Sequence, residues 1–342
     1  MNIIIALLLL GVIIFIHELG HFLAARLFRM PVSEFAIGMG PELYSYYTGR
    51  TLYSIRIIPM GGFVNIDGME VESKVENGFN SKPPLARFVV LFAGVFMNFI
   101  LALIVILGIT FASGKAIQNT NPVIGNIIKE AKASNVLKSN DIIKEIDGTK
   151  ITNWSEIGET IAKDSKERDV LDVVVERDGK DLTLEVPLTK MAADRPPMMG
   201  IVPEYKFEKY GIGEGLSQSF KTFTGIFKDT LSGVKMLVTG KVKAKDISGP
   251  VGIVKVVGEA SKSGSSGILL WLLAILSINV GIFNLLPFPA LDGGRILFVI
   301  LELVGIKVDK KLEERVHTAG MILLFGLIIF ATANDIFNIF KF

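Results

Sequence analysis

Four long apolar runs constrain what this chain can fold into more than any other feature of its sequence. They cover residues 3–28, 85–111, 268–286 and 321–340. A helix needs roughly 20 predominantly apolar residues to cross about 30 Å of hydrocarbon, and each run can supply them. A soluble core has no need of four such helices. The sequence therefore predicts a polytopic α-helical membrane protein with four transmembrane helices, in contact with the lipid bilayer.

The composition excludes several other classes of protein. Of the 342 residues, 50% are hydrophobic, 20% are charged and none is cysteine, which removes disulfides, thiolate zinc sites and cysteine nucleophiles. The formal net charge of +2 is too balanced to indicate a nucleic-acid partner. The first run lacks the basic start and the small-x-small cleavage site of a signal peptide, and it continues into His17 and Glu18. We interpret it as a retained first span.

Basic residues near the span ends predict the orientation of the chain, because cytoplasmic loops carry an excess of Lys and Arg. Residues 1–16 contain no charged side chain. The segment between spans one and two carries Arg26, Arg29, Arg50, Arg56, Lys74, Lys82 and Arg87. The segment between spans three and four carries Arg295, Lys307, Lys310, Lys311 and Arg315. We expect both segments in the cytoplasm, with the N-terminus, the large middle region and the C-terminus outside.

The predicted organisation alternates spans with two inserted regions. The expected boundaries are 1–28 for the first span, 29–84 for a cytoplasmic-side β-hairpin and loop, 85–112 for the second span, 113–190 for an extracytoplasmic α+β domain, 191–267 for a linker and an amphipathic helix, 268–290 for the third span, 291–315 for a Leu-Asp-Gly-Gly segment with a cytoplasmic helix, and 316–342 for the fourth span.

The middle region reads as a compact mixed domain. Residues 123–128, 170–176 and 182–187 are expected strands, residues 155–163 an expected helix, and Asp178-Gly179 a tight hairpin turn. Residues 133–151 resemble the core signature of a PDZ domain, in which a short helix, an aspartate, a buried strand and an Asp-Gly turn follow one another. An unrelated small α+β domain is the alternative.

Two further segments have amphipathic patterns. Residues 214–239 read as a helix with one apolar face. We expect that face either in the membrane interface or packed on the PDZ-like domain. Residues 43–47 and 51–58 flank Thr48-Gly49-Arg50 as a β-hairpin, which is either membrane-associated or a plain cytoplasmic hairpin.

The sequence His17-Glu18-Leu19-Gly20-His21 carries the chemistry of the first span. Positions i and i+4 lie on one face of a helix, so two imidazoles can bind one metal ion while Glu18 lies beside a metal-bound water. Zinc suits imidazole ligands, and a catalytic zinc needs three protein ligands and an open position. Ionisable residues inside an apolar span indicate a functional site, although a polar cluster that holds helices together is the alternative.

The third ligand lies further along the chain. His317, ahead of the fourth span, reads as an interfacial residue, and Glu34 and Glu42 fall in a segment interrupted by proline and glycine. Asp292 follows Pro287 and Pro289, which prevent a regular helix at the end of the third span. Taken alone, Asp292 reads as the N-cap of a helix over residues 295–304. Taken together with the histidine pair, it is the favoured third ligand.

These motifs resemble those of the site-2 protease family of intramembrane zinc metalloproteases, in the bacterial RseP/RasP type with one PDZ domain. The resemblance covers nearly the whole chain. It lies in His17-Glu18-x-x-His21, Gly94-x-x-x-Asn98-Phe99, Ser248-Gly-Pro-Val-Gly252 and Asn284-x-x-Pro287-x-Pro289-x-Leu291-Asp292-Gly293. It implies that His17, His21 and Asp292 bind Zn²⁺ and that Glu18 is the general base.

The same resemblance implies further residues around the site. Asn284 is expected to position the substrate backbone, and an apolar edge strand is expected to pair with an unwound substrate; that strand comprises Gly61, Gly62, Phe63, Val64 and Asn65. Structural roles near the site are expected for Asn98, Pro287, Pro289 and Gly293.

The implied function is hydrolysis of peptide bonds within the transmembrane segments of single-span membrane proteins, such as anti-sigma factors or remnant signal peptides. The expected location is the bacterial cell membrane, with the active site toward the cytoplasm and the PDZ-like domain outside. That domain is expected to act either as a size filter or as a reader of an already trimmed substrate terminus. A catalytically silent scaffold that binds partners through its PDZ-like domain is one alternative. A metal transporter is another, but the two halves of the chain do not repeat in sequence.

Overall fold

The structure is a computed structural model that describes residues 2–69, 75–164, 169–190, 197–242, 249–262, 264–306 and 308–340. Lys74, Ser248 and Lys307, which entered the sequence arguments, and residues 191–196 of the predicted linker lie outside this described part. The chain divides into a helical unit, Met1–Thr110 with Ile212–Phe342, and an α+β unit, Phe111–Gly211.

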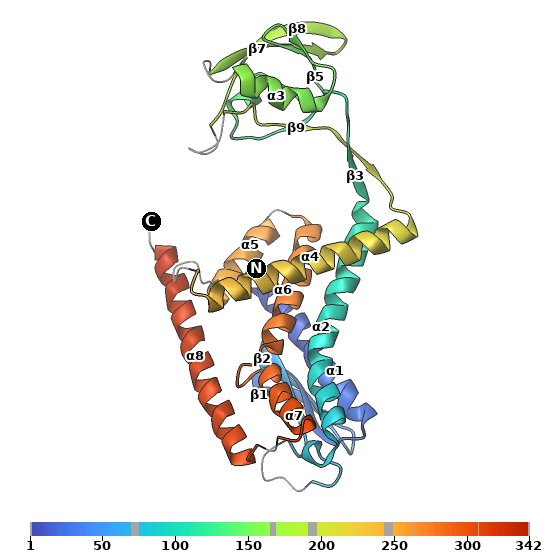
Figure 1. Cartoon of the computed structure of the whole chain (residues 1–342), viewed down its shortest axis with the longest axis vertical. Coiled ribbons are helices and arrows are strands. Elements are labelled where there is room, and N and C mark those ends of the chain that lie inside the picture. Colours follow the sequence, from blue (N-terminus) through green and yellow to red (C-terminus); the bar gives the residue numbers. More distant parts are fainter. Residues whose placement is uncertain are drawn as a thin grey trace. The chain divides into compact units, whose positions relative to one another are not determined.

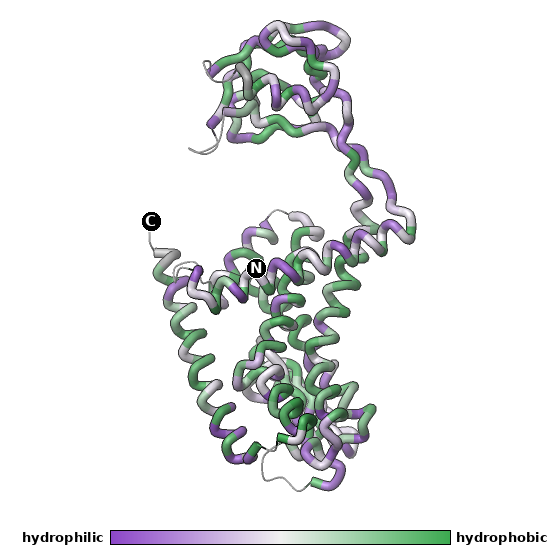
Figure 2. Tube along the Cα trace, viewed as in Figure 1, coloured by the Kyte–Doolittle hydropathy of each residue, from purple (hydrophilic) through white to green (hydrophobic). Residues whose placement is uncertain are grey.

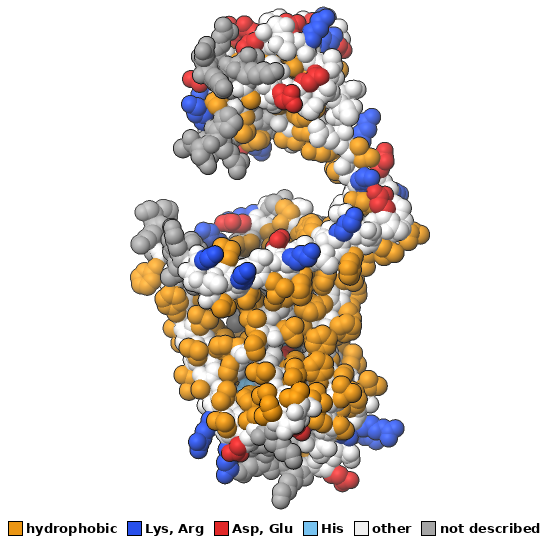
Figure 3. Space-filling view, in the orientation of Figure 1, with side chains coloured by type: hydrophobic (Ala, Val, Ile, Leu, Met, Phe, Trp, Pro, Cys, Tyr) orange, Lys and Arg blue, Asp and Glu red, His pale blue; other side chains and the backbone are white. Residues whose placement is uncertain are grey.

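Four long helices dominate the helical unit (Figure 1). They are α1 (Asn2–Leu27), α2 (Pro84–Ser113), α6 (Ser266–Leu285) and α8 (Lys310–Phe340). All four are long and apolar enough to cross a membrane, which agrees with the four predicted spans. Apolar residues fill the middle of these helices (Figure 2), and apolar side chains form a band whose two ends carry charged groups (Figure 3). Helix α6 ends at Leu285, just ahead of Pro287.

Helices α1 and α2 cross closely because a glycine lies at the crossing. A Cβ at Gly20 would meet the Ala93 carbonyl oxygen at 2.3 Å, so no larger residue fits there without moving the helices apart. Residues of α2 on this side, including Val90 and Leu91, are fully buried. The crossing brings the His17–His21 face of α1 against α2.

Strands β1 (Val32–Tyr47) and β2 (Leu52–Ile66) form more than the predicted hairpin. Each strand bends, so that its register places four segments side by side in the order 44–47, 52–55, 34–37 and 62–65. Arg56 ties the bends together, because it pairs with Glu34 at 2.7 Å and donates to the Gly40 carbonyl at 2.8 Å. Residues 62–65 are consequently an edge of this sheet.

The amphipathic helix α4 (Ile212–Val238) lies across the long helices of the helical unit (Figure 1). Its Phe223, Phe227 and Val234 pack against a buried cluster from α2 and α6 that includes Ile106 and Ile278. The predicted apolar face is therefore divided, since these three residues pack inward while Leu216, Phe220, Leu231 and Val238 stay exposed. The described partners of the inward half are α2 and α6, not the α+β unit.

Helix α5 (Pro250–Lys262) was not predicted, and a buried carboxylate holds its start. Asp335 of α8 is 6% exposed and accepts hydrogen bonds from the backbone amides of Gly249 at 2.9 Å and Gly252 at 2.8 Å. A carboxylate at a helix N-terminus satisfies free amides and interacts favourably with the helix dipole. This contact docks α8 onto α5.

The α+β unit has its own core. A four-stranded sheet has the order β6-β5-β7-β8, and helix α3 (Trp154–Asp164) follows β6. The strands of this sheet are β5 (Ile142–Ile146), β6 (Thr149–Lys150), β7 (Val170–Arg177) and β8 (Lys180–Pro187), and β4 (Ile124–Ile127) precedes them in the chain. Strands β4, β7 and β8 lie close to the three strands predicted at residues 123–128, 170–176 and 182–187, and β6 was not predicted. Asp178 and Gly179 have φ of +54° and +75°, the left-handed conformation of a two-residue hairpin turn.

The linker prediction is wrong for residues 201–208. Strand β9 (Ile201–Pro203) pairs with β4, and strand β10 (Tyr205–Glu208) pairs with β3 (Lys115–Gln118). Both pairings join segments that lie about 80 residues apart, and three- or four-residue strands have too little periodicity to be read locally. The α+β unit therefore extends past the predicted boundary at residue 190.

One buried ion pair supports the α+β unit. Asp141 is 1% exposed and pairs with Arg177 through Nε and Nη2, each at 2.7 Å. Burial acts to raise the pKa of Asp141, but the hydrogen bonds from Arg177 and from the Lys138 amide outweigh it and hold the pKa below its usual value. Its stabilising contribution is complete above the pKa of the unfolded chain and is lost as the pH falls through the lower folded pKa.

We expect Arg177→Ala to lower the free energy of unfolding of the α+β unit by about 3 kcal/mol at neutral pH, because it leaves a buried carboxylate unpaired. Urea unfolding of the full chain, followed by Trp154 fluorescence in a Trp271→Phe background, measures this. The difference from the parent should narrow as Asp141 is protonated in acid. The control is Lys144→Ala, which removes the exposed pairs with Glu176 and Asp181 and should cost much less, because solvent screens them. Equal losses in the two variants would contradict the assignment.

Candidate metal centre

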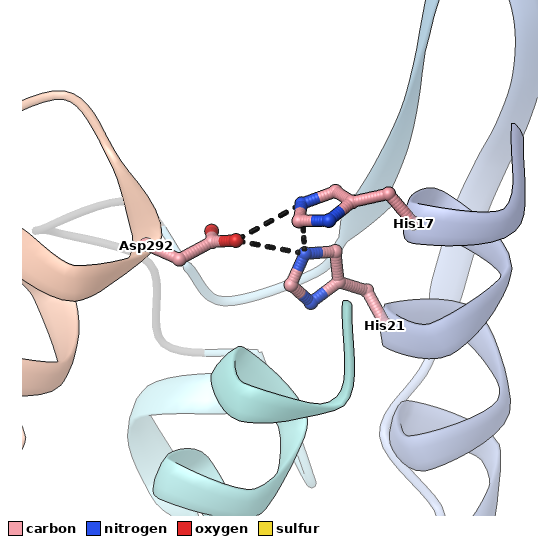
Figure 4. Close-up of side chains that lie close together, drawn as sticks. All are labelled: His17, His21 and Asp292. Carbon is pink, nitrogen blue, oxygen red and sulfur yellow. Dashed lines mark hydrogen bonds and ion pairs between the residues drawn. The ribbon is translucent and has the colours of Figure 1, made fainter. Parts of the chain in front are cut away.

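Two histidines of α1 and one aspartate of α7 (Asp292–Leu303) point toward one another (Figure 4). His17 and His21 are 7% and 8% exposed, and Asp292 is partly buried. Among the described residues these three form a group that could hold a metal ion, with their ligand atoms all within 4.8 Å of one another. The structure thus brings together the three residues that the sequence favoured as ligands.

The spacing of the donor atoms fits a tetrahedral metal. Asp292 Oδ2 lies 3.0 Å from His17 Nε2 and 3.3 Å from His21 Nε2, and the two Nε2 atoms are 3.2 Å apart. Zinc bonds of about 2.0–2.1 Å in a tetrahedral site separate the donor atoms by about 3.3 Å. The three atoms are therefore spaced as three corners of such a site. Asp292 Oδ2 is buried and has no other described partner.

Both imidazoles are oriented by α2. His21 Nδ1 lies 2.8 Å from the Val90 carbonyl oxygen, to which it donates, and this leaves Nε2 as a lone-pair ligand. His17 Nδ1 lies 3.2 Å from the amide of Asn98, which is fully buried. The backbone carbonyl of Asn98 accepts a hydrogen bond from the Ser277 hydroxyl of α6 at 2.8 Å. The predicted structural role of Asn98 is thus orientation of a ligand.

Gly94 provides the space for the two rings. A Cβ at this position would lie 2.4 Å from His21 Nε2 and 2.9 Å from His17 Cε1. Any side chain here would occupy the volume that the donor atoms need. Gly94 and Asn98 are four residues apart on one face of α2, so the same face supplies both the space and the hydrogen bond.

A tight loop after α6 delivers Asp292. Ala290 adopts φ of +79°, and a Cβ at Gly293 would meet the carbonyl oxygens of Leu285 and Leu286 at 2.3 and 2.2 Å. Helix α7 begins at Asp292 itself, with Leu291 in the N-cap position and no side-chain cap. The N-cap interpretation of Asp292 is therefore wrong, because its carboxylate faces the histidines instead of the first turn of its helix.

Helix α8 braces this loop. The Ala290 amide donates to His317 Nδ1 at 3.1 Å, and a Cβ at Gly320 would lie 2.3 Å from the Pro289 Cβ. His317, expected to be an interfacial residue, is thus a support of the ligand loop. The pattern His317-x-x-Gly320, one turn of helix, was the only sequence signal for it.

Glu18 lies beside the edge strand. Its carboxylate accepts a hydrogen bond from the backbone amide of Val64, and a Cβ at Gly62 would lie 3.7 Å from Glu18 Cγ. The predicted substrate-binding residues 61–65 are thus within β2 and next to the predicted base. The side chain of Asn284 is half-buried and makes no hydrogen bond to a described residue, and its substrate role stays a prediction.

The other two acidic candidates, Glu34 and Glu42, interact with Arg56 instead. Glu34 is paired with Arg56 and accepts from the Ser54 hydroxyl at 2.6 Å, and Glu42 lies 3.8 Å from Arg56. Neither belongs to the histidine group among the described residues. Asp292 is therefore the carboxylate of the site.

The chain is similar to known proteins along nearly its whole length. The model of Peptidase family M50 matches residues 5–327. The chain is 50% identical to "Putative zinc metalloprotease FN1322" of Fusobacterium nucleatum over 341 residues, covering 100% of both chains. It is 28% identical to "Regulator of sigma-W protease RasP" of Bacillus subtilis over 417 residues, covering 98% of each. A solved PDZ domain of the SdrC-like protein Lmo2051 from Listeria monocytogenes matches 25% of this chain and 90% of its own, with 21% identity and a TM-score of 0.23.

We expect Gly94→Ala to weaken zinc binding by about 10–100-fold, because the added methyl group displaces the His21 ring. Zinc content of the purified protein, measured by mass spectrometry after dialysis against a graded chelator, tests this. Gly108→Ala in the same helix is the matched control, since its Cβ meets nothing within 4 Å. Retention of zinc by both variants would show that the donor atoms lie elsewhere.

Proposed function

The chain belongs to peptidase family M50 and is a zinc metalloprotease, and from this premise we propose that it cleaves peptide bonds within the transmembrane segments of single-span membrane proteins. The observation that carries the proposal is the position of the metal centre. Two ligands and the base lie within α1, a helix apolar enough to span a membrane, and the third ligand begins a helix directly after the loop that follows α6, another such helix.

The residues of the site divide the hydrolytic work. His17, His21 and Asp292 would hold the zinc ion, which when bound would supply a Lewis acid for the scissile carbonyl and for the attacking water. Glu18 is the group placed to accept the proton of the attacking water and to return it to the leaving amine. The Val64 amide holds the Glu18 carboxylate in place.

The edge strand offers the substrate a new set of backbone partners. A helical substrate hides its carbonyls in internal hydrogen bonds, so it must unwind before it is cut. The Asp67 amide donates to the Pro31 carbonyl, on the β1 side, so the alternation along a strand directs the amides of Gly62 and Val64 away from β1. The Val64 amide holds Glu18, and the Gly62 amide is left for a substrate at the free edge. An extended substrate can pair there and present its backbone beside Glu18.

The basic residues around the ends of the long helices support the proposed orientation. We place the chain in the bacterial cell membrane, with the metal centre toward the cytoplasm and the α+β unit, inserted after α2, on the outside. The name of the Bacillus subtilis relative refers to sigma-W regulation, which makes an anti-sigma factor a reasonable first substrate, and a remnant signal peptide a second.

Glu18→Gln should abolish cleavage, with a loss of at least about a hundredfold, while zinc remains bound. The assay follows a tagged single-span membrane protein co-reconstituted with the purified enzyme, and zinc content is measured on the same samples. Gln keeps the size of Glu but cannot accept the proton. Equal cleavage by the variant and the wild type would refute the assignment of Glu18 as the base.

We expect Val64→Pro to lower kcat/KM about tenfold or more, because it removes the backbone amide that holds the Glu18 carboxylate, a hydrogen bond worth roughly 1–1.5 kcal/mol. Proline is tolerated on an edge strand when its missing amide faces outward. Ser45→Pro is the matched control on the opposite edge of the same sheet. The Thr48 amide faces inward and donates to the Thr51 carbonyl, so the alternation along the strand turns the Ser45 amide outward. Equal activity of the two variants would contradict the role of the Val64 amide in holding Glu18.

A further inference from the structure

A cavity of about 690 Å³ opens at the C-terminal end of α1. Three arginines line it from two separate stretches of chain: Arg26 in the last turn of α1, Arg29 in the turn that follows, and Arg50 in the hairpin turn. Among the described residues that line it, Glu76 is the one with a carboxylate. The metal centre does not use this cavity.

The backbone fixes the three arginines at this place. Arg29 adopts φ of +54°, and the Met30 amide donates to the Ala25 carbonyl at 2.8 Å, which closes the end of α1. The Thr51 hydroxyl donates to the Val32 carbonyl at 2.8 Å and holds the hairpin turn against the start of β1. The site is therefore built by backbone contacts, while its guanidinium groups remain exposed.

None of these three guanidinium groups forms an ion pair with another part of the described chain. Arg26 lies over the ring of Phe22, with 5.5 Å from its Cζ to the ring centroid. By contrast, Arg56, Arg87 and Arg177 are each paired with a carboxylate. Three cations and one anion give the described lining of the cavity a net positive charge of two, which suits an anionic ligand.

The surroundings of the cavity are apolar on the side of α1. Leu23 and Leu27 share a face of the helix with Arg26 and are 51% and 75% exposed. A ligand that fills the cavity with an anionic group can therefore lay an apolar chain along this face.

We propose that this cavity binds the phosphate head group of an anionic phospholipid, with the acyl chains along Leu23 and Leu27. The planar guanidinium groups of Arg29 and Arg50 match phosphate oxygens bidentately. A bound head group bridges the end of α1 to the hairpin turn, and so fixes the sheet whose far edge holds Glu18 through Val64. Basic pockets of this kind at the cytoplasmic side of membrane proteins bind acidic head groups.

The test measures lipid retention, which does not depend on proteolysis. The full chain is reconstituted in vesicles of equal parts phosphatidylglycerol and phosphatidylcholine, extracted in mild detergent, and weighed by native mass spectrometry. We expect the wild type to retain phosphatidylglycerol in preference to phosphatidylcholine, and Arg29→Gln/Arg50→Gln to retain it about tenfold less or worse. Lys311→Gln/Arg315→Gln removes the same charge from exposed positions on α8 and should retain it as the wild type does.

Three results would overturn the proposal. Equal retention by the Arg29→Gln/Arg50→Gln variant and the wild type would show that the cavity is not the site. Equal retention of both lipids by the wild type would show no selection for an anionic head group. Displacement of the lipid by millimolar inorganic phosphate alone would identify a site for a soluble anion instead.

Discussion

The burial of two imidazoles and a carboxylate among apolar helices is the constraint on which the rest of this structure depends. A neutral polar group costs roughly 2–7 kcal/mol when it is removed from water without partners, and an ionised carboxylate costs far more. Here α2 supplies the partners of the imidazoles through the Val90 carbonyl and Asn98, and Ser277 of α6 secures Asn98. The remaining donor atoms meet one another at 3.0–3.3 Å, a spacing that a shared metal ion satisfies.

Close backbone contacts make this convergence possible. Gly20 lets α1 approach α2, Gly94 leaves room for the rings, and Gly293 lets α7 start beside the end of α6. Helix α8 is held at two places, by Gly320 and His317 on the ligand loop and by Asp335 at the start of α5. Few residues of α8 are buried along its length, and this helix therefore supports the site through contacts near its two ends.

The sequence predicts those features of the structure that depend on local or periodic patterns of residues. The four apolar helices follow from run length, and His17 and His21 from i,i+4 spacing on one helix. Asp292 was ambiguous, because a carboxylate after two prolines suits an N-cap as well as a ligand, and only the approach of α7 to α1 decides between them. The pairing of β4 with β9, the double pairing of β1 with β2, and the capping of α5 by Asp335 join residues far apart in the chain, and no local pattern specifies them.

The most direct test of the central claim is X-ray absorption spectroscopy at the zinc edge of the purified protein. For the wild type we expect nitrogen and oxygen ligands at about 2.0–2.1 Å and outer-shell scattering from two imidazoles. For His21→Ala we expect scattering from one imidazole fewer. Unchanged imidazole scattering in that variant, or a first shell of six oxygens, would contradict a centre formed by His17, His21 and Asp292.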